Sequence, residues 1–260
     1  MSAVLLRGAA EQGLIYCLVA LALYLSYRTL NIADLTVDGS FTLGASAAAM
    51  LTTLGHPVLG LLAATGAGAL AGIVTALLQT EWKVQPILAG IITMTALYSI
   101  NLRVMGNRSN LPLLRVETVY TLFSARLPEA LAPWGKLLLS LLIAAAVSVF
   151  LFFFLRTRLG LSIRATGDNR TMVSASSINP AFTTTVGLAM ANALVSLSGG
   201  MLAQYQMFSE ITLGTGMVVI GLASLIIGEV IVDLFVRSPG VGSAIIGAIL
   251  GAVVYRIIIA

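Results

Sequence analysis

The sequence has few charged residues, a single cysteine and a single histidine. One cysteine, Cys17, excludes an intrachain disulfide, and one histidine, His56, cannot build a metal site on its own. Only 9% of the 260 residues are charged, whereas about a quarter of an ordinary soluble domain is charged. Because so few polar residues cannot cover the surface of a soluble fold, the composition indicates a membrane protein.

Motifs for catalysis are also missing. The one Gly-Lys pair, Gly135-Lys136, lacks the upstream glycine and the following Ser or Thr of a phosphate-binding loop. No His-Glu-x-x-His or Cys-x-x-Cys spacing occurs, and the basic residues are too scattered to form a nucleic-acid footprint. We therefore expect no catalytic residue, metal or cofactor in this chain. A partner would have to supply any ATP hydrolysis.

Long apolar runs are what the sequence has in abundance, since 58% of its residues are hydrophobic. A helix needs roughly 20 apolar residues to cross a bilayer. The sequence predicts one transmembrane domain over residues 1–260, an all-α polytopic integral membrane protein with about eight transmembrane helices. The predicted spans are 13–27, 39–54, 58–79, 86–100, 134–155, 181–203, 214–235 and 241–259.

Charge does not orient these spans. Eight alternating spans place seven of the 14 Lys and Arg residues on each side of the membrane. Two long polar segments, 101–133 and 156–180, then lie on opposite sides. Small residues spaced four apart, at 68–72 and 247–251, predict close helix packing within the chain, with a dimer contact as the alternative.

Two short segments resemble each other. An acid, an aliphatic residue, Thr, another aliphatic residue and two glycines occur in the same order in 34–44 and, with one insertion, in 210–221. Either the match is chance, or it marks an inverted repeat whose glycine-interrupted helices flank a solute pathway. In the second case Thr42, Ser46 and Thr215 would line that pathway and suit a small zwitterion.

Glu229 and Asp233 are acids within or at the end of a predicted span, and their spacing places them on one helix face. A charge at that depth is costly, so it should face protein or water. We interpret the pair as an inner gate or a contact to a partner. The alternative is a structural hydrogen bond or an ion pair with Arg237. Asn192 and Asn101 are weaker polar candidates.

The polar segment 156–180 is the most informative part of the chain. Turn residues are expected at Gly160, Gly167, Asp168 and Asn169. Asp168 or Asn169 can cap a short helix over 170–177, and Asn179-Pro180 then begins the next span. Such a helix either docks on a partner or is a plain surface helix.

Three stretches of sequence carry a family resemblance. They are Arg158-Leu-Gly-Leu-Ser-Ile-Arg-Ala-Thr-Gly-Asp-Asn169, Ser177-Ile-Asn179 and Leu197-Ser-Gly-Gly200. Together they resemble the permease subunits of ATP-binding-cassette (ABC) importers, in the branched-chain amino acid and ribose permease superfamily. The region from Asn31 to Gly44 is similar to a branch that includes proposed tryptophan and other amino-acid importers. The resemblance covers about residues 10–259.

The resemblance implies that 156–180 is a cytoplasmic coupling segment and 101–133 is extracytoplasmic. It implies a multi-pass permease of the bacterial inner membrane that moves an amino acid, works as a homodimer and has two further partners. These are an ABC ATPase subunit, which would bind ATP and Mg²⁺, and an extracytoplasmic solute-binding protein. The expected coupling residues are Arg164, Ala165, Gly167, Asp168, Asn169, Val173, Ala175, Ile178 and Asn179. With the repeat, the expected pathway residues are Asn31, Asp34, Asp38, Thr42, Ser46, Thr215, Gly216 and Gly221.

Two departures from the family pattern stand out. Ser177 occupies a position where the family usually has glycine, and relatives usually continue through another apolar span after the position of Ala260. We therefore expect either a short member or part of a longer protein. Two other functions stay open from the residues alone: a secondary transporter or channel driven by an ion gradient, and a membrane scaffold.

Overall fold

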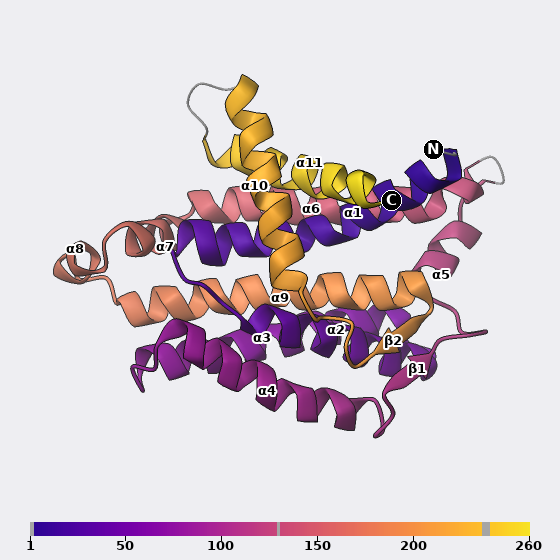
Figure 1. Ribbon diagram of the computed structural model, residues 1–260, viewed down its shortest axis with the longest axis horizontal. Coiled ribbons are helices and arrows are strands. Elements are labelled where there is room, and N and C mark those ends of the chain that lie inside the picture. The colour runs from indigo at the N-terminus through magenta and orange to yellow at the C-terminus, as the bar shows by residue number, and fades with distance from the viewer. Residues whose placement is uncertain (1–2, 129–130, 236–239) are drawn as a thin grey trace.

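Helices make up most of the structure, a computed structural model that describes residues 3–128, 131–235 and 240–260 (Figure 1). Eight long helices lie at or close to the eight predicted spans, which confirms the all-α prediction. They are α1 (Ala3–Leu23), α2 (Thr36–Thr53), α3 (Pro57–Thr80), α4 (Pro86–Val104), α6 (Gly135–Arg156), α9 (Pro180–Gln206), α10 (Met217–Phe235) and α11 (Val241–Ile259).

Seven helices in the described part of the chain are long and apolar enough to cross a membrane. The long helix outside this set is α2, which carries Asp38 and several hydroxyl side chains. Most residues of α2 are buried among the other helices. Because these neighbours shield it from lipid, α2 tolerates polar side chains that a lipid-facing helix would not. Seven of the eight predicted spans are therefore helices whose length and composition suit a membrane span, and α2 is the exception.

Shorter elements lie at the two ends of this helical layer (Figure 1). At one end, α7 (Arg158–Asp168) and α8 (Arg170–Ala175) follow α6, and α1 ends nearby in a π-helical turn, η1 (Tyr24–Thr29). We call this the α8 end. The opposite end, which we call the β end, holds the remaining short elements: β1 (Asn110–Pro112), β2 (Phe208–Glu210), α5 (Val119–Ala125) and η2 (Ala132–Trp134). The two strands pair antiparallel, and α1 begins and α11 ends on this same side (Figure 1).

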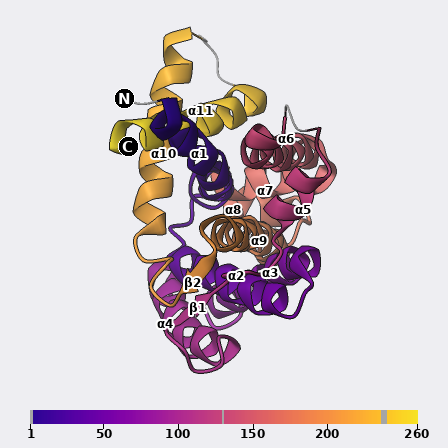
Figure 2. The same cartoon turned by 90° about the vertical axis from the view of Figure 1, so that its right-hand side faces the viewer.

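Small residues let α2, α3 and α9 pack closely at the centre of the molecule (Figure 2). A Cβ built on Gly68 or Gly72 of α3 would overlap the backbone of α9, and one built on Gly44 of α2 would overlap the carbonyl of Ser196. Gly251 of α11 lies equally close to α10. The small-residue spacings in the sequence therefore serve packing within the chain, as predicted.

Candidate functional site

The two segments with matching sequence meet inside the molecule. The loop after β2, residues 211–216, runs back from the β end and reaches the first turns of α2 (Figure 1). The Asp38 carboxylate accepts hydrogen bonds from the N–H groups of Gly216 and Val218, each at 2.9 Å. The Thr42 hydroxyl accepts one from Gly214 N–H at 3.0 Å. Asp38 therefore caps the N-terminus of α10 from another helix.

The chemistry of this contact follows from helix geometry. The first N–H groups of a helix have no partner within the helix, and the helix dipole gives that end a partial positive charge. A carboxylate at this end accepts hydrogen bonds from the free N–H groups and supplies the negative charge that the helix dipole favours. The loop is also irregular, with Gly216 in the left-handed region at φ +81°. Irregular backbone among membrane helices is tolerated only beside protein or a watery cavity, and here Asp38 and Thr42 satisfy the N–H groups that the turn frees.

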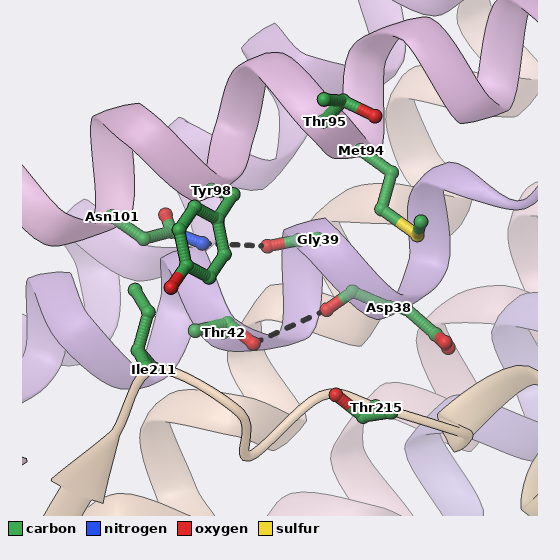
Figure 3. Close-up of a pocket in the computed structure, with 9 residues that line it drawn as sticks. All are labelled: Asp38, Gly39, Thr42, Met94, Thr95, Tyr98, Asn101, Ile211 and Thr215. Atoms are coloured by element: carbon green, nitrogen blue, oxygen red, sulfur yellow. Dashed lines mark hydrogen bonds between the residues drawn. The ribbon is translucent and has the colours of Figure 1, made fainter. Parts of the chain in front are cut away.

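A cavity of about 300 Å³ opens between α2, α4 and this loop (Figure 3). Three of the predicted pathway residues, Asp38, Thr42 and Thr215, lie together in its wall. Its lining residues are Asp38, Gly39, Thr42, Met94, Thr95, Tyr98, Asn101, Ile211 and Thr215. The structure thus brings the two matched segments to one site. The inverted repeat stays a prediction.

The contribution of α4 to this wall was not predicted, apart from the weaker claim for Asn101. Thr95, Tyr98 and Asn101 follow one another at intervals of three, which places them along one face of α4. Polar groups at this spacing in an otherwise apolar span are the sequence signal that could have identified the wall. Met94 and Ile211 carry no such signal, because apolar residues are common throughout the chain.

Other predicted pathway residues lie away from this cavity. Ser46 is fully buried and donates a hydrogen bond to the carbonyl of Leu43, one turn back in α2. Gly221 lies against Val19 and Leu23 of α1. Asn31 is exposed near the α8 end, in a hollow lined partly by α7. Gly216 is not among the lining residues, but its N–H donates to the Asp38 carboxylate.

Asp34 belongs to a buried polar network that joins α2 to α9. Its carboxylate accepts hydrogen bonds from Thr36 N–H at 2.9 Å and from the Asn192 amide at 2.7 Å. The Ser40 hydroxyl donates to the Asn192 side-chain oxygen at 2.7 Å, and Ser196 donates to the carbonyl of Ser40. Asp34 and Asn192 therefore hold the start of α2, next to the turn that carries Asp38, against α9.

A second polar cluster lies near the α8 end. Glu229 of α10 pairs with Arg28 of η1 at 2.9 Å, and both side chains are partly exposed. Arg164 and Asp233 line the same hollow of about 210 Å³. Glu229 is thus paired with a residue the sequence did not suggest, whereas the alternative partner, Arg237, lies outside the described residues. The cluster ties the far end of α10 to the end of α1.

We expect the Glu229→Gln variant to lower transport by no more than about fivefold, because partly exposed ion pairs contribute about 0.2–1 kcal/mol. Arg28→Glu should act similarly, and the charge-swapped double variant Arg28→Glu/Glu229→Arg should recover much of the loss. Initial rates of solute uptake measure this. A loss far greater than fivefold for Glu229→Gln, with no recovery in the double variant, would show that the carboxylate does more than bridge two helices.

The segment 156–180 forms two helices where the sequence suggested one. Gly160, Gly167 and Asp168 were predicted as turn residues, but all three lie within α7. A Cβ on Gly160 would overlap the carbonyl of Phe154, and one on Gly167 would overlap the carbonyl of Thr29. These glycines allow close packing, so the expectation of turns there was wrong.

The capping predictions for this segment are confirmed. The Asn169 side chain accepts the N–H of Met172 at 3.0 Å and begins α8, and Asn179 with Pro180 begins α9. Ser177 has φ +59°, a left-handed conformation that glycine adopts more readily than serine. The predicted 170–177 helix ends earlier, at Ala175.

The expected coupling residues divide into an exposed and a packed group. Ala175, Asp168, Asn169 and Asn179 are exposed at the tip of the α8 end. Val173 is only 2% exposed and anchors α8. The rest are Ala165, Gly167 and Ile178, which are partly buried, and Arg164, which is exposed but lines the hollow beside Glu229.

Comparisons with known proteins identify the family of the chain. Residues 5–259 match a family described as the permease component of branched-chain amino acid transport systems. The chain is 36% identical over 238 residues to a "Tyrosine transport system permease protein" of Clostridioides difficile (strain R20291), covering 91% of this chain and 77% of that protein.

Two further similarities complete the comparison. An uncharacterised protein of Rickettsia prowazekii (strain Madrid E) is 33% identical over 227 residues, which cover 86% of this chain and 77% of that protein. The solved structure of PsaBC from Streptococcus pneumoniae in complex with Fab has a TM-score of 0.44 and 16% identity, over 98% of this chain and 88% of that chain.

Proposed function

Since the chain belongs to the permease components of branched-chain amino acid transport systems, we propose that its solute passes through the cavity between α2 and α4. The chain is a multi-pass membrane permease of an amino-acid importer. What supports this route is the Asp38 contact, which joins α2 to the start of α10 at a cavity lined by both polar and apolar side chains.

An aromatic or branched amino acid is the proposed solute. The relative from Clostridioides difficile is described as a permease for tyrosine, which makes tyrosine the first solute to test. The cavity offers hydroxyl, amide and carboxylate groups together with Met94, Tyr98 and Ile211. That mixture fits a solute with one polar end and one apolar end.

We further propose that the permease lies in the bacterial inner membrane, with its α8 end on the cytoplasmic side. There the α8 end docks on a separate ABC ATPase. The β end then faces a solute-binding protein, and a second copy of the chain completes the permease. Two features of α8 support docking: all its residues except Val173 are exposed, and the helix is held in place by the buried Val173 and by the Asn169 cap. A short, anchored, projecting helix is a shape that fits a groove in a partner.

The Ala175→Glu substitution tests this docking site. We expect uptake to fall about tenfold or more while ATP hydrolysis no longer follows transport, because steric and charge mismatch at a packed interface costs several kcal/mol. The matched control is Ala175→Ser, which keeps the residue small and uncharged. Uptake and ATP hydrolysis are measured on the same complex. Normal uptake by an Ala175→Glu permease that retains its ATPase would place the coupling contact elsewhere.

A further inference from the structure

A second cavity, of about 560 Å³, lies at the β end, where α1 and α6 begin and α9 ends (Figure 1). Its lining comes from α1, α5, η2, α6 and α9. Within the described part of the chain, its charged lining residues are Arg7, Glu11 and Lys136. Two cations against one acid leave this cavity with an excess of one positive charge.

The acid in this cavity already has partners for both of its oxygens. Arg7 Nε donates to Glu11 Oε1 at 3.0 Å, and the Tyr205 hydroxyl donates to Glu11 Oε2 at 2.8 Å. Glu11 is also only 5% exposed. Because Arg7 balances its charge, Glu11 serves the contact between α1 and α9 and leaves Lys136 as the unbalanced charge.

The two cations keep donors that can bind a ligand. The bond from Arg7 uses Nε, so the N–H groups of both Nη atoms have no hydrogen-bond partner among the described residues. Lys136 is exposed and has no ion pair within the described ranges; its Nζ lies 5.0 Å from the centroid of the Tyr205 ring. A guanidinium and an ammonium group at one cavity are the donors that phosphate oxygens favour.

The cavity lies where a helix enters the bilayer. Trp134 and Lys136 stand at the beginning of the apolar helical stretch 132–156, of whose membrane window only 33% is buried. Trp134 is half exposed, and the Arg7 guanidinium carbon lies 4.7 Å from the centroid of its ring. Tryptophan with a neighbouring cation is typical of the headgroup level. Leu5 and Leu6, which precede Arg7, are exposed apolar side chains. A lipid headgroup is therefore the source of phosphate that this position favours.

We propose that this cavity binds the phosphodiester headgroup of an anionic phospholipid, with Arg7 and Lys136 as the phosphate-binding residues. A phosphodiester carries one negative charge, which matches the excess charge of the cavity. A zwitterionic headgroup brings a further cation, for which the described lining offers only the paired and buried Glu11. The bound lipid links α1 to α6 at the β end. This site is independent of the proposed solute route.

Trp134 provides the reporter for a test. The chain has two tryptophans, so Trp82→Phe leaves Trp134 as the only one. The purified full chain with this substitution is reconstituted into phosphatidylcholine vesicles that contain a small fraction of lipid with brominated acyl chains, which quench a nearby tryptophan. The brominated lipid is phosphatidylglycerol in one series and phosphatidylcholine in the other.

We expect phosphatidylglycerol to bind about fivefold more strongly than phosphatidylcholine near Trp134, because a single cation at the membrane surface attracts an anionic lipid by about this factor. Lys136→Gln should lower the preference to about twofold or less. The matched control is Arg115→Gln, which removes an exposed cation at the β end outside the cavity lining and should keep the preference. Millimolar inorganic phosphate should displace no more phosphatidylglycerol than chloride does at the same ionic strength.

Three results would overturn the inference, and they are distinguishable. Equal quenching by the two lipids excludes selection of an anionic lipid and leaves the cations to a carboxylate of a partner protein. A preference that survives Lys136→Gln belongs to the overall charge of the chain and not to this cavity. Displacement by inorganic phosphate beyond the effect of chloride makes free phosphate the ligand. The comparison of the two lipids at an intact Lys136 does not depend on how the Lys136 variant folds.

Discussion

Replacing Asp38 by alanine is expected to reduce amino-acid uptake about tenfold or more. The substitution removes two hydrogen bonds from a carboxylate to the N-terminus of α10. Hydrogen bonds to a charged group contribute about 1.5–3 kcal/mol each, and 1.4 kcal/mol corresponds to a factor of ten. Without them the N–H groups of Gly216, in the loop, and of Val218, in the first turn of α10, are left unpaired, and the cavity loses the one charged residue of its described lining.

Initial uptake rates per amount of permease in proteoliposomes check this prediction. Asp38→Asn keeps the shape and one acceptor, so its loss should be smaller than that of alanine. Glu117→Ala, at an exposed acid in the segment between α4 and α6, is the control for removing a carboxylate as such. If Asp38→Ala transports as well as Glu117→Ala, the Asp38 contact does not position α10 for transport.

Gly167→Ala should uncouple ATP hydrolysis from transport, because it disturbs the contact between α7 and η1. We expect uptake to fall about tenfold or more. A Cβ at this position would overlap the carbonyl oxygen of Thr29 and approach Leu30. Overpacking typically costs about 1–3 kcal/mol, and here the obstacle is backbone, which cannot rotate away. We therefore expect α7 to shift from η1, the element that carries Arg28.

The matched control is Gly66→Ala in α3, where a Cβ meets nothing within 4 Å. Because alanine is the better helix former, Gly66→Ala should leave uptake unchanged and slightly raise stability. The ratio of solute moved to ATP hydrolysed, measured for both variants in the same complex, separates uncoupling from poor expression. An unchanged ratio for Gly167→Ala would show that the α7 contact with η1 does not carry the coupling.

The membrane helices could be predicted from the sequence because their limits have local causes. Apolar runs set their lengths, and Pro57, Pro86 and Pro180 stand in the first turn of three of them, where a missing N–H does no harm. The start of α10 was less well predicted. Residues 214–216 were placed in the span, but they belong to the loop that Asp38 and Thr42 hold.

The residues of the candidate site that were predicted are those that could be recognised within one short segment of sequence. Asp38 and Thr42 share a face of α2, and Thr215 lies in the segment that matched it. The spacing of Thr95, Tyr98 and Asn101 marks a polar face of α4, but the position of that face opposite α2 depends on how the two helices pack, which no local pattern fixes. Gly160 and Gly167 were misinterpreted for a related reason. Glycine is common both in turns and at close contacts between helices, and which of the two applies depends on the segment that packs against it.

Uptake of tyrosine by proteoliposomes that contain the permease, its ATPase and its solute-binding protein tests the central claim most directly. Transport is measured with and without ATP, and with and without a protonophore. An ATP-driven permease takes up tyrosine only when ATP is hydrolysed, and collapse of the proton gradient at constant ATP leaves the rate unchanged. Uptake that proceeds without ATP and stops when the gradient collapses would contradict it, and would make the chain a gradient-driven transporter.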